Sequence, residues 1–326
     1  MSASIHDILR NDSKRLEAVL NLDSSSARIE VQCLLQAVLQ VDRAWLLTHP
    51  EQALNDEHLS RYTALFERRL NGEPIAYLLA VREFYGLNFK VTPATLIPRP
   101  ETELLVELAL QRIPQPLVKQ LAIRLGHQET MAKSLVIPPS PTPPGLPLSG
   151  EEWGRSMNTF RVLDLGTGSG AIALSIAHAR PDAEAVAVDA SQDALEVARE
   201  NAQRLNIGNV HLLRSDWFTA LRGEHFDLIV SNPPYVAAND AHLAQGDLRF
   251  EPLAALASGA DGLDDIRRIC AQAKAHLNPG GWLLLEHGYD QAERVRTLLQ
   301  QAGFAGIFSA RDLSGIERVS GGTCLP

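Results

Sequence analysis

Apolar residues recur at helical spacing along the first part of the chain. Leu16, Val19 and Leu20 follow one another at i, i+3 and i+4, which places them on one face of a helix. A later helix is expected over about residues 58–70, because an Asn-Gly pair, a common helix stop, follows it. This stretch contains no glycine-rich loop and no cluster of catalytic side chains. We predict a small helical domain over residues 1–73 that packs on a partner or on the rest of the chain.

The hydrophobic period changes after this helical stretch. Residues 84–91 show the pattern of a β-hairpin, with Gly86 and Asn88 at the turn. We interpret residues 74–100 as a hairpin linker between two domains. Pro100 then begins a helix, since proline suits the first helical position.

A proline-rich segment over about residues 114–158 interrupts the pattern. Closely spaced prolines prevent a regular hydrogen-bonded ladder, because proline has no backbone N–H. We expect an exposed connector without regular structure, and we assign it no chemistry.

Short apolar runs alternate with amphipathic segments in the second half of the chain, which predicts a parallel sheet with helices on both faces. The expected strands are 161–165, 184–189, 209–214, 226–231, 281–287, 304–310 and 316–320. The expected helices are 169–180, 191–206, 263–277 and 289–302. Most of the strand runs are short and apolar, as a sheet covered on both faces requires. The sequence therefore predicts a Rossmann-like α/β domain.

The composition fits a two-domain globular protein, because the chain has 326 residues of which 45% are hydrophobic. Its formal net charge of −9 argues against a protein that binds nucleic acid mainly through a basic surface. The three cysteines, Cys33, Cys270 and Cys324, form no CxxC pair, so neither a disulfide framework nor a metal site is expected. The N-terminus lacks the pattern of a signal peptide, and no run of about 18 apolar residues occurs. We therefore expect a cytoplasmic protein without a membrane span.

A glycine-rich turn connects the first expected strand of the α/β domain to its first helix. The turn consists of Gly166, Thr167, Gly168, Ser169 and Gly170. Glycines allow a ligand to approach the backbone closely, and the helix N-terminus offers free N–H groups. The spacing is G-x-G-x-G, which differs from the dinucleotide pattern G-x-G-x-x-G. Asp164, on the preceding strand, would repel a pyrophosphate but suits a ligand with a cationic amino group.

The next two strands end in polar residues that fit a nucleoside. Asp189 ends the second strand, where a carboxylate binds ribose hydroxyls. Asp216 and Trp217 follow the third strand, where an acid can hydrogen-bond to adenine and an aromatic ring can stack on it. A ligand with a ribose and an amino-acid end fits these groups together with Asp164. We therefore predict that the cofactor is S-adenosylmethionine.

The fourth strand ends at the sheet edge where open α/β domains bind their ligands. The motif at this end consists of Asn232, Pro233, Pro234 and Tyr235. The prolines present carbonyl acceptors on a stiff backbone, and Asn232 adds a side-chain acceptor. Tyr235 can cover a flat group with its ring. Converging acceptors suit an –NH2 group, so we predict attack by a planar amino or amide nitrogen.

This chemistry leaves several classes of protein open. An N6-adenine DNA or RNA methyltransferase also acts on a planar –NH2 group, although the negative net charge and the lack of a basic recognition domain argue against it. A NAD-dependent dehydrogenase is disfavoured by the glycine spacing and by Asp164. A non-catalytic adaptor would bind a partner through the helical domain and transfer no methyl group.

With these motifs in order, the chain resembles the HemK/PrmC family, which methylates N5 of the glutamine in the Gly-Gly-Gln motif of peptide chain release factors. The resemblance covers nearly the whole chain and includes the stretches 73–79, 84–86, 96–103, 249–252 and 314–319. The Pro-Arg-Pro-Glu-Thr-Glu sequence is closer to the release-factor enzyme than to its relative that methylates a ribosomal-protein glutamine. Two segments depart from the family: residues 114–158 are extra, and the tail 320–326 is atypical, which puts contacts of the last residues in question.

The resemblance implies a Rossmann-like class I S-adenosylmethionine-dependent methyltransferase with a mostly parallel seven-stranded sheet. It also implies a substrate-recognition role for the helical domain, with the methyltransferase domain over residues 101–326. The implied catalytic residues are Asn232, Pro233 and Tyr235. The implied cofactor-binding residues are Asp164, Gly166, Thr167, Gly168, Ser169, Gly170, Asp189, Asp216, Trp217 and Asn232. The implied substrate-binding residues are Asn232, Pro233, Pro234, Tyr235, Arg99 and Glu251.

Two of these residues carry an open alternative, since Arg99 between two prolines can belong to a rigid linker and Glu251 can form an ion pair with Arg249. The implied partner is a class I release factor, bound through its Gly-Gly-Gln loop. The resemblance further implies a monomer that binds neither nucleic acid directly nor a membrane, and that needs no metal.

Overall fold

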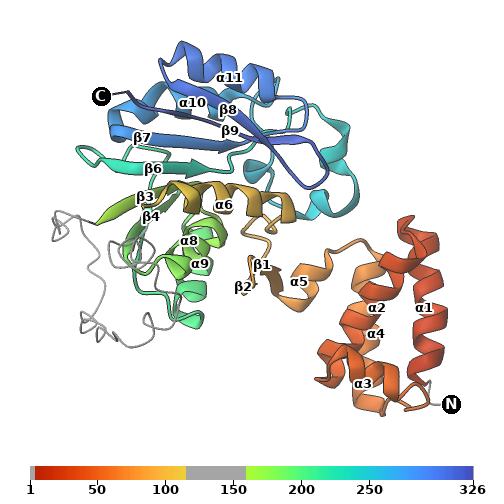
Figure 1. Ribbon diagram of the computed structural model, residues 1–326. Coiled ribbons are helices and arrows are strands. Elements are labelled where there is room, and N and C mark those ends of the chain that lie inside the picture. Colours follow the sequence, from red (N-terminus) through yellow and green to blue (C-terminus); the bar gives the residue numbers. More distant parts are fainter. Residues whose placement is uncertain (1–3, 115–158, 326) are drawn as a thin grey trace, which may run out of the picture. The chain divides into compact units, whose positions relative to one another are not determined.

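A computed structural model describes residues 4–114 and 159–325 of the chain (Figure 1). The expected connector over about 114–158 lies outside the described residues, apart from its first position. Contacts within the chain define two compact units. The first unit comprises the chain up to Arg82, together with Asn88–Ile97 and Asn239–Leu256. The second unit comprises Glu83–Leu87, Pro98–Ala238 and the chain from Ala257 onward.

Helices α1 to α5 form most of the first unit, and they span Ile5–Leu20, Ser24–Leu39, Arg43–Thr48, Asp56–Leu70 and Ile75–Leu79. The first four helices begin at residues whose side chains accept hydrogen bonds from backbone N–H groups, namely Ser4, Asp23, Asp42 and Asn55. Their apolar faces meet in one buried cluster. The expectation of an N-terminal helical domain is confirmed. One detail was wrong, because Val19 is 61% exposed and lies outside that cluster.

The expected hairpin is present as a two-stranded sheet of β1 (Val81–Phe84) and β2 (Leu87–Lys90). Its turn is formed by Tyr85 and Gly86, with φ angles of 51° and 75°. Positive φ at both central positions is the geometry of a tight hairpin turn. The prediction that Asn88 lies at the turn was wrong, because this residue belongs to β2.

Asn239–Leu256 belongs to the first unit although it lies far along the chain, and it consists mainly of the 3-10 helices η2 (Ala241–Ala244), η3 (Gly246–Phe250) and η4 (Leu253–Ala255). Arg69 of α4 links this segment to the helices. Its guanidinium, 3% exposed, lies 2.7 Å from a carboxylate oxygen of Glu30 and 3.1 Å from one of Asp247. Arg249 also donates a hydrogen bond to the carbonyl oxygen of Asn71.

A seven-stranded sheet forms the centre of the second unit. Its strands are β3 (Phe160–Leu165), β4 (Ala183–Asp189), β5 (Val210–Arg214), β6 (Phe226–Ser231), β7 (Leu277–Glu286), β8 (Ala305–Arg311) and β9 (Glu317–Thr323). They are ordered β5-β4-β3-β6-β7-β9-β8, and β9 runs antiparallel to both of its neighbours. The expectation of a mostly parallel seven-stranded sheet is confirmed.

Helices cover both faces of this sheet, and they are η1 (Pro100–Thr102), α6 (Glu103–Arg112), α8 (Ala171–Ala179), α9 (Gln192–Arg204), α10 (Asp264–Ala273), η5 (Lys274–His276) and α11 (Ala292–Gln301). Leu163 and Leu165 of β3 share a buried cluster with Ile266 of α10. Asp164, between them, faces the opposite side, where it accepts a hydrogen bond from the backbone N–H of Ala173 in α8. Figure 1 shows α8 and α9 on the other side of the sheet from α10 and α11.

The tail that departs from the family pattern takes part in the sheet. Ser320 pairs with Leu285 of β7 and with Ser309 of β8, and pairing continues to Thr323. Within residues 4–114 and 159–325, none of the helices has both the length and the apolar character needed to cross a membrane. In the same part of the chain, no group of three or more His, Cys, Asp and Glu side chains is arranged to hold a metal ion.

Candidate active site

The order of the strands reverses between β3 and β6, so the carboxyl ends of β3 to β6 border a topological switch point. Ligands of open α/β sheets bind at such points. The sequence-predicted cofactor residues and the Asn-Pro-Pro-Tyr motif lie at these strand ends or directly after them in the second unit. The structure therefore brings these residues to one edge of one sheet.

The glycine-rich turn after β3 has the backbone shape that its sequence predicted. Gly166, Gly168 and Gly170 have φ angles of 71°, 57° and 85°, a region that favours glycine. The N–H groups of Gly166 and Thr167 both donate to the carbonyl oxygen of Val188, which ties the turn to β4. A Cβ atom built on Gly168 would meet nothing within 4 Å, so the backbone is open to a ligand there.

Asp164 is fully buried beneath this turn. Its Oδ2 accepts hydrogen bonds from the Thr167 hydroxyl at 2.7 Å and from the Ala173 N–H at 3.1 Å. Its Oδ1 is buried and has no hydrogen-bond partner within the described residues. Burial raises the pKa of Asp164 to about 7. A donor from a bound ligand would satisfy Oδ1 and favour the carboxylate, so this orphaned acceptor fits the ammonium group of S-adenosylmethionine.

Asp189 ends β4 and holds the glycine turn from the other side. Its Oδ2 accepts a hydrogen bond from the Gly168 N–H at 2.9 Å, and its Oδ1 accepts one from the Ser191 N–H at 2.8 Å. Burial raises the pKa of this carboxyl group. Each carboxylate oxygen retains a second lone pair, so Asp189 can still accept from a ribose hydroxyl.

Asp216 and Trp217 follow β5, and Trp217 has a φ angle of 50°. The indole ring lies beside the glycine turn, because a Cβ built on Gly166 would be 3.5 Å from it. Its Nε1–H donates to a carboxylate oxygen of Asp265 at 3.2 Å, and Asp216 pairs with Arg268 at 2.9 Å. The ring position is compatible with a stacking role for Trp217, and contact of either residue with adenine stays a prediction.

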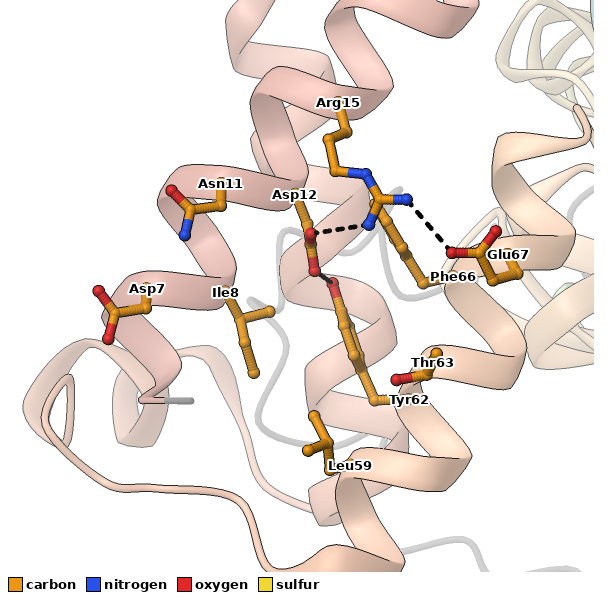
Figure 2. A pocket seen from close by; sticks show the side chains of 10 residues that line it. All are labelled: Asp7, Ile8, Asn11, Asp12, Arg15, Leu59, Tyr62, Thr63, Phe66 and Glu67. Atoms are coloured by element: carbon orange, nitrogen blue, oxygen red, sulfur yellow. Dashed lines mark hydrogen bonds and ion pairs between the residues drawn. The ribbon is translucent and has the colours of Figure 1, made fainter. Parts of the chain in front are cut away.

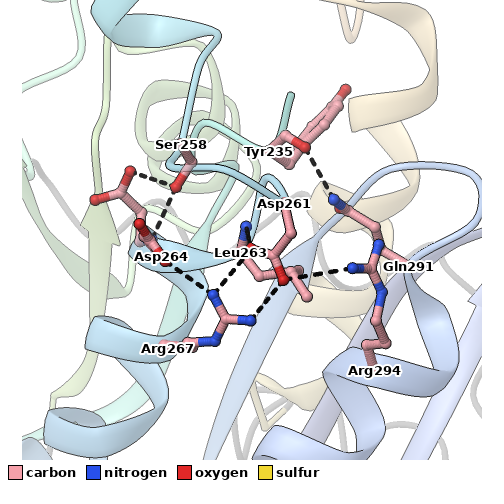
Figure 3. Close-up of polar contacts among 9 residues, drawn as sticks. Tyr235, Ser258, Asp261, Leu263, Asp264, Arg267, Gln291 and Arg294 are labelled. Atoms are coloured by element: carbon pink, nitrogen blue, oxygen red, sulfur yellow. Dashed lines mark hydrogen bonds and ion pairs between the residues drawn. The ribbon is translucent and has the colours of Figure 1, made fainter. Parts of the chain in front are cut away.

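The Asn-Pro-Pro-Tyr loop is anchored on both sides. Before it, the hydroxyl of buried Ser231 donates to the carbonyl oxygen of Leu165 at 2.7 Å. At its end, the carbonyl oxygen of Tyr235 accepts a hydrogen bond from Gln291 Nε2 at 2.9 Å (Figure 3). Gly262 packs against the same carbonyl, and a Cβ there would lie only 2.2 Å from its oxygen. The loop therefore has a fixed backbone path.

The loop after Tyr235 is supported by a second set of polar contacts, which Figure 3 shows beside it. Arg267 of α10 pairs with Asp261 at 2.6 Å and with Asp264 at 2.8 Å. The hydroxyl of Ser258 donates to Asp265 at 2.7 Å and accepts from the N–H of the same residue at 2.9 Å. These contacts fix the turn that carries Gly262.

Two residues that sequence reasoning missed contact the Asn232 side chain. Its amide nitrogen donates to the Thr102 hydroxyl oxygen at 3.1 Å. Glu286 is the last residue of β7, and both Thr102 and Asn232 act to lower the pKa of its carboxyl group. The carboxyl group is 1% exposed, and burial raises its pKa to about 7. A usable signal existed, because Glu286 ends an apolar strand in the same way as Asp189.

The remaining sequence-predicted residues lie around this site or in the first unit. The ring of Tyr235 packs partly on the sheet's core, and burial raises the pKa of its phenol. Arg99 directly precedes η1, and its positive charge partly offsets this rise in the pKa of Tyr235. Glu251 belongs to the first unit, where its buried carboxylate accepts a hydrogen bond from the Ile97 N–H at 2.9 Å.

The helical unit contains a shallow pocket of about 170 Å³ between α1 and α4 (Figure 2). Asp12 accepts a hydrogen bond from the Tyr62 hydroxyl at 2.9 Å and lies 3.5 Å from Arg15. Arg15 also pairs with Glu67 at 3.3 Å. Because these groups satisfy one another, the pocket indicates no particular ligand.

Comparisons with known proteins cover both units. The PrmC N-terminal domain model matches residues 7–79, and the methyltransferase small domain model matches residues 155–249. A release factor glutamine methyltransferase of Xylella fastidiosa strain Temecula1 is 46% identical over 297 residues, covering 91% of this chain and 93% of the relative. The Burkholderia pseudomallei protein of the same name is 48% identical, covering 92% of each chain. The Escherichia coli K12 protein of that name is 43% identical, covering 93% of this chain and 95% of the relative.

Proposed function

Since this chain belongs to the release factor glutamine methyltransferase family, we infer that it transfers a methyl group from S-adenosylmethionine to a glutamine of a peptide chain release factor. We propose further that the acceptor is the N5 amide nitrogen of the glutamine in the Gly-Gly-Gln motif of class I factors. The observation that supports this reaction best is the identity of 43% to 48% to such enzymes over more than nine-tenths of the chain. Relatives with these names do not favour the nucleic-acid methyltransferase, ribosomal-protein methyltransferase, dehydrogenase or adaptor alternatives.

The cofactor is held in this proposal by the groups around the glycine-rich turn. Asp164 binds the ammonium group, Asp189 binds the ribose hydroxyls, and Asp216 with Trp217 holds the adenine. The turn from Gly166 to Gly170 presents its backbone to the ligand. When bound, S-adenosylmethionine supplies an electrophilic methyl group on a sulfonium centre.

The protein activates the acceptor by position rather than by a strong base. An amide nitrogen is a poor nucleophile because its lone pair is delocalised into the carbonyl group. The Asn232 side-chain oxygen and the Pro233 carbonyl oxygen each accept one N–H of the substrate amide, which directs its nitrogen. Hydrogen bonds to both N–H groups also stabilise the positive charge that develops on nitrogen during transfer. Pro234 stiffens the loop, and Tyr235 stacks on the flat amide.

The two parts of the chain have separate roles in this proposal. The helical domain over residues 1–73 recognises the release factor, residues 74–100 link it to the rest, and residues 101–326 form the methyltransferase domain. Arg99 and Glu251 support binding of the substrate loop. The enzyme acts in the cytoplasm as a monomer and recognises its substrate without direct contact to nucleic acid.

The test combines the purified protein with methyl-labelled S-adenosylmethionine and a release factor that carries either Gly-Gly-Gln or Gly-Gly-Ala. We expect label in the first factor and none in the second. Label in both factors would refute the glutamine assignment, and label in neither would refute the release-factor substrate. Stabilisation of the protein against heat by S-adenosylmethionine but not by NAD checks the cofactor separately.

A further inference from the structure

Glu286 occupies an unusual place for an ionisable group. The register between β6 and β7 pairs Ser231 with Leu285, so Glu286, the last residue of β7, lies beside Asn232, the residue that follows β6. The Glu286 carboxyl group is almost fully buried, and its Oε2 has no hydrogen-bond partner within the described part of the chain. Burying a carboxyl group is costly, and a hydrophobic residue would fill this strand end without that cost. A buried acid that contacts a proposed catalytic side chain therefore calls for a functional explanation.

The hydrogen bonds around Glu286 have a defined direction. The Asn232 amide nitrogen carries two hydrogens, and it donates to the Thr102 oxygen at 3.1 Å. Thr102 and Asn232 both lower the pKa of Glu286, as donors to its carboxylate do, and an ionised carboxylate can only accept because it has no hydrogen to donate. In this arrangement the Thr102 hydroxyl accepts from Asn232 and can turn its own hydrogen toward Glu286. The second hydrogen of the Asn232 amide can then be donated to the same carboxylate.

The direction of these bonds determines which end of the Asn232 amide is available to a substrate. If the amide were rotated by a half-turn, its oxygen would face the Glu286 carboxylate, and two acceptors would repel each other. We propose that Glu286 and Thr102 are positioning residues that hold the Asn232 nitrogen, so that its Oδ1 is the end that accepts the substrate amide N–H. This proposal rests on the proposed role of Asn232 in methyl transfer.

The charge state of Glu286 is part of this role. Two charged groups act on the Glu286 carboxyl group: Glu101 of η1, and Arg318, which precedes the β9 residue Val319 that pairs with Glu286. In turn, the charge of Glu286 raises the pKa of the Tyr235 phenol. Burial is the main cause that raises the pKa of Glu286, and Glu101 adds to it, whereas Arg318 lowers it. A protonated Glu286 can donate to the Asn232 oxygen, which would stabilise the rotated, unproductive amide. Turnover should therefore fall as the pH decreases through the pKa of Glu286.

The test measures turnover and KM for the release factor from pH 6 to pH 8.5 at saturating S-adenosylmethionine, for the wild type and for Glu286→Gln, Thr102→Val and Thr102→Ser. Glutamine keeps the size of Glu286 but can present either an acceptor or a donor to Asn232. We expect its turnover to fall by up to about 100-fold, the scale of a misplaced reacting group, with KM little changed. Its pH profile should lose the step that the wild type shows.

The two threonine variants test whether a hydroxyl group at position 102 is sufficient to keep turnover. Thr102→Val keeps the shape of the side chain but removes the acceptor for the Asn232 nitrogen, and it should lower turnover, whereas Thr102→Ser keeps the hydroxyl and should restore it. Glu317→Gln is the matched control, because it neutralises a carboxylate on the neighbouring strand β9 whose ion-pair partners are Arg296 and Arg311. It should retain the turnover and the pH profile of the wild type.

The outcomes separate this inference from the proposed function. An active wild type with a Glu286→Gln variant of unchanged turnover and unchanged pH profile would overturn the positioning role alone. Equal loss of turnover and of S-adenosylmethionine affinity, measured by calorimetry, would also overturn it, because that result indicates a structural role. A wild type that methylates no release factor would overturn both proposals.

Discussion

The side-chain nitrogen of Asn232 donates a hydrogen bond to the hydroxyl oxygen of Thr102 at 3.1 Å, although 130 positions separate the two residues in the chain. This bond joins the Pro-Arg-Pro-Glu-Thr-Glu sequence before α6 to the Asn-Pro-Pro-Tyr loop after β6. Thr102 is itself 4% exposed, so the contact is shielded from water. The loop that we propose to bind the substrate amide is therefore fixed by a motif from a distant part of the chain.

Replacing Asn232 by alanine should lower the turnover number about 100-fold or more, because the substrate amide would lose one of its two proposed acceptors in the transition state. Affinity for S-adenosylmethionine should change much less. Steady-state kinetics with a release factor, together with calorimetric titration of the cofactor, measure both quantities. Asn239→Ala, at an exposed position shortly after the same loop, is the control and should behave as the wild type. Equal losses of turnover and cofactor affinity for Asn232→Ala would contradict the positioning role.

Replacing Asp164 by asparagine should stabilise the cofactor-free protein at pH 8 while weakening cofactor binding. Burial raises the folded-state pKa of Asp164 from 3.8 to about 7, so the folded protein binds this proton more tightly than the unfolded chain. Its contribution to stability is therefore present below about pH 4 and is lost as the pH rises through 7. The upper bound of the gain in unfolding free energy is about 4 kcal/mol at pH 8, and it should shrink toward pH 5.

Chemical denaturation of the Asp164→Asn variant at pH 5 and pH 8 checks the stability side of this prediction. Calorimetric titration with S-adenosylmethionine checks the other side, where loss of a charge-assisted hydrogen bond should weaken binding about 10- to 100-fold. Asp193→Asn, at an exposed position in the first turn of α9, serves as the control. Unchanged cofactor affinity in Asp164→Asn would argue against an ammonium contact at this carboxylate.

Most of the sheet could be predicted from the sequence because most of its strands are short, mainly apolar runs that end in a turn or a polar residue. The expected strand 226–231 agrees with β6, and the expected strand 184–189 differs from β4 by one residue. Asp189 could be placed at the site for the same reason, since the carboxyl ends of parallel strands meet at one edge. The local pattern of apolar and polar residues therefore encodes where a strand lies and where it ends.

The contacts around Glu286 could not be predicted because they depend on the order of the strands. This acid ends an apolar run as Asp189 does, but only the pairing of β7 with β6 places it beside Asn232. The membership of Asn239–Leu256 in the helical unit was missed for a similar reason. It depends on side-chain contacts such as Arg69 with Asp247, which are 178 positions apart and leave no periodic signal in the sequence.

Replacing Arg69 by methionine should destabilise the helical unit by about 2–3 kcal/mol. The guanidinium is buried between Glu30 and Asp247, and its removal leaves both carboxylates without this partner. The loss lies at or just below the lower limit for a buried pair, about 3 kcal/mol, because the side chain of Asp247 is 44% exposed. Arg68→Met is a stringent control, since the neighbouring Arg68 side chain is 53% exposed and pairs with Glu73.

Denaturant unfolding followed by circular dichroism measures this difference. The control variant should lose less than about 0.5 kcal/mol, as expected for an exposed pair. If both variants lost a similar amount of unfolding free energy, the buried ion pairs of Arg69 would stabilise the protein no more than the exposed pair of Arg68.

Replacing Gly262 by alanine should displace the loop that carries the proposed catalytic residues. The new Cβ would lie 2.2 Å from the carbonyl oxygen of Tyr235, far inside van der Waals contact, so either the turn or the loop must shift. The variant also has a cost that is unrelated to the site, because Gly262 has a φ angle of 76°, where an L-residue is strained by about 1–2 kcal/mol. Turnover should fall by about 100-fold, the scale of a small misplacement of reacting groups.

Gly280→Ala separates the two effects of this substitution. Gly280 has a φ angle of 80°, nearly that of Gly262, but a Cβ built there meets nothing within 4 Å. Both variants should lose similar stability from backbone strain, as measured by thermal unfolding, whereas only Gly262→Ala adds the clash. A turnover that falls equally in the two variants would show that strain, and not the position of Tyr235, accounts for the loss. A large loss confined to Gly262→Ala would instead tie catalysis to the backbone path after Asn232, because the two substitutions then differ only in what the new methyl group touches.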